Sequence, residues 1–395
     1  MLNKRITDIV AGDIQGLIDN QVPEGKTIEY KEALPSDSDD KFEFLRDVSA
    51  FANAVGGDII YGVSERRDSH GKPTGIPQEI VGLPGANLDA EKLRLEQILR
   101  TGIEPKIPVI QMQAVEIDSG TKVLVIRIGD SWQRPHHICF KASPRYYTRT
   151  SAGKQPLDYL EIRDAFIQSA DLPKRLREFR DQRLATILSG DMLFELPGGP
   201  VIALHFLPLE AFRRQNVVEL TPFIYGTRVF PTGIGIGGHQ RPNLDGVIQY
   251  SVGGGEIGRH MYGFTQIFHS GAIEIVDGFT ISSDENQIAT VALEKSLYLA
   301  LKSASNCLRD MGMNNYVYLF LSIMNVKGYR LYERGISSRA GLRKEVDRNN
   351  LLFPELQLDL AESFEIPHRK LCDQFWQACG ANCSLNFDET GKWTA

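Results

Sequence analysis

Two glutamates and a lysine lie close together in the stretch PEGKTIEYKEAL, residues 23–34. Glu24 and Glu29 are five positions apart, and Lys31 follows the second glutamate by two. Carboxylates that converge on one point repel each other, so they need a divalent cation or a cationic side chain to neutralise them. Oxygen ligands favour Mg²⁺ or Mn²⁺, which can orient a phosphodiester and activate water. The alternative is an ordinary strand on which Glu29 pairs with Lys31 while Glu24 and Glu32 face solvent.

A second stretch, residues 131–156, is rich in cations and aromatic rings and contains no aspartate or glutamate. Because cations suit phosphates and aromatic rings stack on unpaired bases, this stretch predicts a nucleic-acid-binding surface. The alternative is a pair of strands whose aromatic rings lie in the core and whose cations extend along the surface. The predicted contacts are Arg134, His136, Lys141, Arg145, Tyr147 and Arg149.

Two further patterns carry no functional prediction. GIGIGG, residues 233–238, has the Gly-x-Gly-x-x-Gly spacing of dinucleotide sites, but HQRPNLDG follows it where a helix N-terminus is needed. His368, Cys372 and Cys379 lie on one predicted helical face, which indicates a buried core stripe and not a zinc knuckle.

The elements that carry the first motif can be assigned from apolar periodicity. Apolar residues at helical spacing predict an amphipathic helix over residues 5–20. Alternation over residues 27–32 predicts a strand with Glu29 and Lys31 on the same face.

The next segments continue this alternation of helix and strand. KFEFLRDVSAFANAVGG predicts a helix that stops at Gly56 and Gly57, and the apolar run DIIYGVSE directly after it predicts a strand. A helix over residues 88–101 and a β-hairpin that turns at 118–120 are predicted to follow.

A chain of 395 residues exceeds the size at which one hydrophobic core keeps growing, so two domains are predicted. Residues 156–188 are predicted to form two helices, the second beginning near Pro173. The Gly- and Pro-rich stretch 189–200 is predicted to be a linker. We therefore predict an α+β protein with a first domain over residues 1–188 and a second α+β domain over 201–395.

The composition is that of a soluble globular protein, with 42% hydrophobic and 24% charged residues. A formal net charge of −6 gives no global attraction to nucleic acid, so binding requires a local basic surface. Acidic residues interrupt the apolar residues of the first twenty positions, which suits neither a signal peptide nor a membrane span. Five thinly spread cysteines predict reduced thiols, and we expect a cytoplasmic location without membrane partners.

The order of these motifs resembles the Schlafen-type AlbA domain, a family known from bacterial proteins and from the vertebrate Schlafen proteins. The resemblance rests on IEYKEAL with its Glu-x-Lys, on VSAFANAVGG running directly into DIIYGVSE, and on the later segment RYYTRTSAG. It covers residues 5–170. It implies nucleic-acid binding, with RNA preferred to DNA because the vertebrate members include enzymes that cut RNA.

In the RNA-cutting members three carboxylates form the site, and the matching positions in this chain are Glu24, Glu29 and Glu65. The resemblance therefore implies an endoribonuclease in which these glutamates hold Mg²⁺ or Mn²⁺ and Lys31 assists. It further implies cleavage of structured RNA such as tRNA in antiphage defence, and a homodimer that supplies a second AlbA-like lobe. The alternative hypotheses are a nucleic-acid-binding regulator without catalysis and an assembly scaffold.

Overall fold

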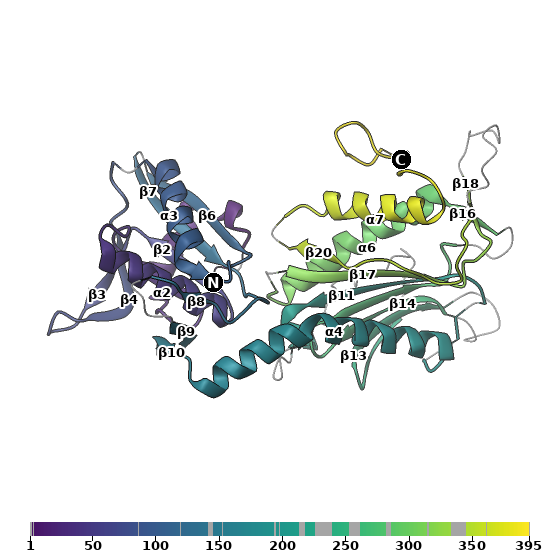
Figure 1. Ribbon diagram of the computed structural model, residues 1–395, viewed down its shortest axis with the longest axis horizontal. Coiled ribbons are helices and arrows are strands. Elements are labelled where there is room, and N and C mark those ends of the chain that lie inside the picture. The colour runs from purple at the N-terminus through teal and green to yellow at the C-terminus, as the bar shows by residue number, and fades with distance from the viewer. Residues whose placement is uncertain are drawn as a thin grey trace. The chain divides into compact units, whose positions relative to one another are not determined.

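The chain forms two compact units, Met1–Leu172 and Pro173–Ala395. The computed structural model describes residues 2, 4–85, 87–118, 120–140, 145–151, 153–192, 195–196, 198–212, 218–225, 239–252, 261–281, 286–313, 316–332, 345–360 and 362–394. Both units combine helices with sheets, which confirms the predicted α+β class (Figure 1).

A four-stranded sheet with the order β1-β2-β7-β6 forms the centre of the first unit. β1 runs parallel to β2, and the β2–β7 and β7–β6 pairs are antiparallel, so the predicted hairpin is confirmed. The strands are β1 (Ile28–Lys31), β2 (Gly57–Tyr61), β6 (Ile110–Asp118) and β7 (Thr121–Ile128).

Helices cover both faces of this sheet, because apolar side chains of β7 alternate between two cores. Leu124 and Ile126 pack with α2 (Ser38–Asn53) and α3 (Leu88–Gly102). Val123 and Val125 pack with the short 3-10 helix η1 (Ile6–Asp8) and with α1 (Ala11–Asp19), into which the helix predicted over 5–20 is divided. Burial on both faces explains why the strand is a continuous apolar run.

Helix α2 begins after a capping aspartate and ends three residues before the predicted stop at Gly56. The carboxylate of Asp37 accepts hydrogen bonds from the backbone N–H groups of Asp39 and Asp40, both at 2.8 Å, and so caps the helix. Gly56 follows the helix with a φ of +74°, a conformation that favours glycine. The chain then enters β2 directly, as predicted.

Two strands, β3 (Val63–Arg67) and β4 (Pro73–Ile80), form a ribbon that projects from the rest of the first unit (Figure 1). The stretch DIIYGVSE, predicted as one strand, is divided into β2 and β3 at Gly62, which has a φ of +97°. The division allows the chain to leave the central sheet and start the separate ribbon.

A second small sheet, with the order β10-β9-β8-β5, packs beside α2 in the first unit. Ile138 and Tyr147 of this sheet belong to the same buried core as Phe44 and Leu45 of α2. Its strands are β5 (Ile103–Glu104), β8 (His137–Ile138), β9 (Arg145–Thr150) and β10 (Gly153–Pro156).

One helix, α4 (Tyr159–Ser189), stands where two helices were predicted, and the division between the units falls inside it. Pro173 lies within the helix, which therefore lacks one backbone N–H donor at that turn. Leu184 and Ile187 pack on the sheet of the second unit. The last turns of α4 thus belong to the second unit, ahead of the linker expected at 189–200.

The second unit is an eight-stranded sheet with the order β12-β13-β14-β15-β11-β17-β19, in which β20 also pairs with β17. Helices α6 (Thr290–Asp310) and α7 (Glu365–Ala378) cover one face, and α4 covers the other (Figure 1). The strands are β11 (Val201–Pro208), β12 (His239–Asn243), β13 (Gly246–Val252), β14 (Met261–Phe268), β15 (Ile273–Asp277), β17 (Tyr316–Met324), β19 (Leu351–Leu352) and β20 (Leu356–Asp359).

Smaller elements complete this unit: η2 (Leu209–Phe212), α5 (Thr221–Tyr225), and the parallel pair of β16 (Gln287–Ala289) with β18 (Arg330–Tyr332). The GIGIGG segment at 233–238 lies outside the described residues. Across the described ranges, no helix carries an apolar run long enough to cross a lipid bilayer.

Candidate functional site

The three predicted glutamates come from segments that meet beside β1. Glu29 lies in β1, Glu24 precedes that strand, and Glu65 lies in β3. Gly75 of β4 connects two of them: its carbonyl accepts from the backbone N–H of Glu24 at 2.7 Å, and its own N–H donates to the Glu65 carboxylate at 3.1 Å. Glu24 and Glu65 therefore both lie beside the middle of the β3–β4 ribbon, where Glu65 is opposite Pro77.

Glu29 is buried and has two cationic partners. One carboxylate oxygen accepts from the ammonium of Lys31, and the other accepts from the guanidinium of Arg149. Arg149 is fixed in turn by a 2.6 Å hydrogen bond from its Nε to the carbonyl of Gly25, and it lies 4.4 Å from the centre of the Phe51 ring. The pairing of Glu29 with Lys31 that the alternative interpretation expected is therefore present, and Glu32 is exposed as that interpretation also expected, whereas Glu24 is half-buried and does not face solvent.

Asp47 of α2 is a member of this site that the sequence interpretation missed. Its side chain is 1% exposed, and its Oδ1 lies 2.8 Å from the ammonium of Lys154 and 3.6 Å from Arg149. Lys154 also donates to Glu43 at 2.7 Å. The signal in the sequence is the spacing: Asp47 stands three residues after Phe44 and four before Phe51, on the apolar stripe of its helix.

The pKa values of Glu24 and Glu29 are shifted in opposite directions. Burial, followed by the charge of Glu29, raises the pKa of Glu24 to about 7. Burial would also raise the pKa of Glu29, yet the charges of Lys31 and Arg149 hold it below its ordinary value. Burial and the charge of Glu29 raise the pKa of Asp47. Lys31 stays cationic, because its burial is outweighed by the carboxylates of Asp47 and Glu29, which raise its pKa.

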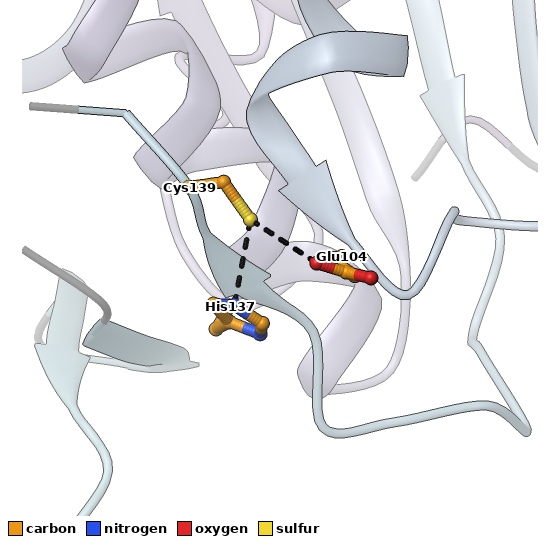
Figure 2. A group of neighbouring side chains, drawn as sticks. All are labelled: Glu104, His137 and Cys139. Carbon is orange, nitrogen blue, oxygen red and sulfur yellow. Dashed lines mark hydrogen bonds between the residues drawn. The ribbon is translucent and has the colours of Figure 1, made fainter. Parts of the chain in front are cut away.

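The glutamates do not form the carboxylate cage that the metal prediction requires. Within the part of the chain that the structure describes, Glu104, His137 and Cys139 are the one His/Cys/Asp/Glu triple whose ligand atoms all lie within 4.8 Å of one another (Figure 2). Both oxygens of Glu29 already accept from cations, so Lys31 and Arg149 supply the neutralising charge expected of a metal ion. Binding of Mg²⁺ or Mn²⁺ stays a prediction.

The basic segment at 131–156 is more buried than a phosphate-binding surface requires. Tyr147 and Arg149 alternate inward along β9, where they contact Arg46 and Phe51 of α2. The prediction that these two side chains contact nucleic acid is not supported by their burial, and for Tyr147 the alternative of a core aromatic ring holds. Arg145, at the start of β9, is exposed.

The other predicted contacts of this segment are in three different situations. His136 is fully buried: its ring nitrogens lie 2.7 Å from the carbonyl of Pro105 and 2.6 Å from the hydroxyl of Ser131. Burial lowers the pKa of His136 to about 4, so the ring is neutral and serves the core, not a phosphate. Arg134 is half-buried and donates to Gln168 at 3.0 Å. Lys141 lies outside the described residues.

Exposed cations gather instead at the tip of the β3–β4 ribbon, which the sequence interpretation did not single out. Residues 66–74 are all exposed and include Arg66, Arg67 and Lys72. Asp68 is the one acid there, and its carboxylate accepts from the backbone N–H groups of His70 and Lys72, each at 2.9 Å. The signal in the sequence is the predicted turn ERRDSHGKP, which contains two arginines and a lysine.

These features define an α+β protein whose first unit surrounds a mixed sheet with helices and buries a network of acids and cations. Residues 24–158 match the domain family described as Schlafen, AlbA_2. This segment of the chain is therefore a Schlafen-type AlbA domain, and its family indicates a function connected with nucleic acid.

Two solved structures are similar to parts of the chain. The N-terminal domain of an ATP-dependent DNA helicase RecG-related protein from Nitrosomonas europaea is 23% identical, with a TM-score of 0.28, over 36% of this chain and 88% of its own. The DIP2311 protein from Corynebacterium diphtheriae is 17% identical, with a TM-score of 0.24, over 37% of this chain and 30% of its own. No curated protein matches the chain.

Proposed function

We propose that the first unit binds nucleic acid and that the tip of the β3–β4 ribbon makes the main contact. The observation that carries the proposal is the exposure of Arg66, Arg67 and Lys72 together on an element that projects from a Schlafen-type AlbA domain. Cations on a projecting ribbon can reach phosphates on both sides of a groove. An acidic protein needs such a local surface in order to bind a polyanion.

The proposed ligand is RNA in preference to DNA, since the motifs resemble those of RNA-cutting members of the family. Arg145, exposed on β9, is a second proposed contact. Phosphate contacts position a nucleic acid without reading its sequence, so the ribbon alone gives affinity and little base specificity. Binding should weaken steeply as salt increases.

The test is fluorescence anisotropy with a tRNA and with a DNA duplex of similar length, at several salt concentrations. Arg66→Ala and Lys72→Ala should each weaken binding and reduce the slope of log K against log[salt] by about one. The matched control is Arg100→Ala, which removes an exposed arginine from α3. If all three variants bind as the wild type does, the ribbon is not the contact. Equal affinity for the tRNA and the DNA duplex would support nucleic-acid binding but contradict the proposed preference for RNA.

A second proposed function, cleavage of the bound RNA, is favoured by one observation. Gly75 holds Glu24 and Glu65 together beside the middle of the same ribbon, and the cationic Lys31 lies beside Glu29 at 32% side-chain exposure. A phosphodiester bound by the ribbon could thus reach two carboxylates and an ammonium, the groups needed for acid–base catalysis and charge stabilisation.

Cleavage is tested on a tRNA pool with Mg²⁺ or Mn²⁺ present. Glu24→Gln and Glu65→Gln should lower the rate by about a hundredfold or more while leaving tRNA binding intact. Glu79→Gln, an exposed glutamate of β4, is the matched control and should cleave normally. Equal rates for all variants, or no cleavage by the wild type, would leave a nucleic-acid-binding protein without catalysis.

A further inference from the structure

The second unit contains a polar cavity with a volume of about 360 Å³. Side chains from the last turns of α4, from the segment directly after it, and from β12, β13 and β14 line this cavity. Its volume is near the lower end of the range of about 300–1,000 Å³ that is typical of small-molecule sites. The polar lining side chains that matter below are Arg183, Asp191, Arg241, Asn243, Asp245 and Gln266.

One wall of the cavity is a fixed pair of side-chain amides. Gln266 of β14 is 2% exposed; its Oε1 accepts from Asn243 Nδ2 at 2.6 Å, and its Nε2 donates to Asn243 Oδ1 at 3.1 Å. Asn243 Oδ1 also accepts from the backbone N–H of Gly246 at 2.8 Å. The second N–H of the Asn243 amide has no acceptor among the described residues, so it is available to a ligand in the cavity.

Arg183 is a cation whose charge is already balanced. Its Nε and Nη2 donate to the two carboxylate oxygens of Glu274 at 3.0 and 2.8 Å, and Glu274 is fully buried. Burial would lower the pKa of Arg183, but the carboxylates of Glu274 and Asp245 raise it. Arg183 therefore contributes a rigid, neutralised ion pair to the cavity.

The other three charged side chains of the lining are not balanced in this way. Asp191, Arg241 and Asp245 are exposed, and within the described ranges none of them forms an ion pair. They present two negative charges and one positive charge to the cavity. A ligand with complementary charges carries two positive groups and one negative group.

We propose that this cavity binds a free basic amino acid, such as lysine or arginine. Arg241 and Asn243 lie on the same face of β12, where a guanidinium and an amide N–H suit the carboxylate of the ligand. Asp191 and Asp245 suit its α-ammonium and its side-chain cation. Ile248 and Phe264 supply apolar surface for the aliphatic part of the ligand. The site lies in the second unit and does not depend on the proposed nucleic-acid binding.

The test is titration calorimetry of the full chain with L-lysine and L-arginine. Two compounds related to lysine separate the charged groups: L-norleucine lacks the side-chain ammonium, and cadaverine lacks the carboxylate. At least one basic amino acid should bind with one molecule per chain, and norleucine and cadaverine should bind about tenfold or more weakly than lysine. The proposal is overturned if neither basic amino acid binds, or if norleucine or cadaverine binds as tightly as lysine.

Substitutions in the cavity give a second readout. Asp245→Asn and Arg241→Gln should each weaken the binding of the basic amino acid by about tenfold, and both positions are exposed, so the core is not disturbed. Arg241→Gln should also reduce the discrimination between lysine and cadaverine, because the partner of the carboxylate is removed. The matched controls are Asp347→Asn and Arg348→Gln, whose side chains are 78% and 77% exposed outside this cavity. Wild-type affinity in both cavity variants, or an equal loss in the controls, would contradict the assignment.

Discussion

Arg149 helps to neutralise the buried carboxylates of Glu29 and Asp47 in the first unit. It pairs with Glu29, lies 3.6 Å from Asp47, and is itself 2% exposed in its side chain. Arg149→Met keeps an extended side chain but leaves two buried carboxylates with one cation fewer. Because breaking a buried pair strands the remaining charge, the free energy of unfolding should fall by about 3–5 kcal/mol.

Hydrogen exchange of the backbone amides in β1 and β2 measures this change within the first unit. Arg145→Met is the matched control, since it removes the exposed arginine of the same strand and should alter the free energy of unfolding by less than about 0.5 kcal/mol. A similar loss for both variants would show that the network around Glu29 is not what Arg149 stabilises.

His136 should make the stability of the first unit sensitive to acid. Its pKa is about 4 in the folded chain against an ordinary value of 6.5, because burial disfavours the charged ring. The unfolded chain therefore binds a proton that the folded chain does not. The first unit therefore keeps its full stability above pH 6.5 and loses stability as the pH falls toward 4, where the loss reaches about 3 kcal/mol.

The pH dependence is measured as the free energy of unfolding between pH 7 and 4, followed by denaturant titration. His136→Gln should show a smaller decline than the wild type over this interval, although it is less stable at pH 7. The control His70→Gln removes an exposed histidine of the β3–β4 ribbon and should keep the full wild-type decline. Parallel curves for the wild type and His136→Gln would contradict the assignment.

At the scale of elements, the sequence predicted those helices and turns that depend on interactions between neighbouring residues. Local patterns were sufficient for α3, for the hairpin of β6 and β7, and for the glycine turn at Gly56 that separates α2 from β2, because each follows from neighbouring residues. The proximity of Glu24 and Glu29 also followed from one strand motif. The inward orientation of Arg149 did not, because it requires Asp47 as a partner from a helix a hundred residues away, and sequence spacing does not contain that pairing.

Gly56, which joins α2 to β2, gives a test of this junction. A Cβ at Gly56 would lie 2.6 Å from the backbone oxygen of Ile128 and 2.9 Å from the backbone nitrogen of Asp130. Gly71 has nearly the same φ, +75° against +74°, with open space around it. Both Gly→Ala changes carry the cost of a left-handed alanine, about 1–2 kcal/mol, and only Gly56→Ala adds a backbone clash.

Thermal denaturation of the two variants separates these contributions. Gly56→Ala should lower the melting temperature of the first unit clearly more than Gly71→Ala does, because backbone atoms on both sides cannot move away without disturbing the sheet. If the two variants melt together, backbone conformation alone accounts for the glycine at the end of α2.

At the scale of the whole chain, a single buried carboxylate fixes the C-terminal segment of the second unit. Glu294 of α6 accepts hydrogen bonds from four side chains that lie far along the sequence. The donors are Trp376 at 2.9 Å, Ser384 at 2.6 Å, Asn386 at 2.8 Å and Trp393 at 3.0 Å. A carboxylate has only acceptor sites, so it can satisfy all of these donors at once.

Glu294→Gln should therefore release the C-terminal segment. The amide keeps the shape of the carboxylate, but its NH₂ group has two N–H donors that would face the donors of the neighbouring side chains. It also removes the negative charge that strengthens each hydrogen bond. The free energy of unfolding should therefore fall by about 3 kcal/mol or more. Limited proteolysis should cut the variant within residues 380–394 sooner than the wild type, and tryptophan fluorescence should shift as Trp393 becomes solvated. Glu365→Gln, on the exposed face of α7, is the control and should be cut at the wild-type rate. Equal cleavage of the two variants would mean that apolar contacts such as the stacking of Tyr298 on Trp393 hold the segment instead.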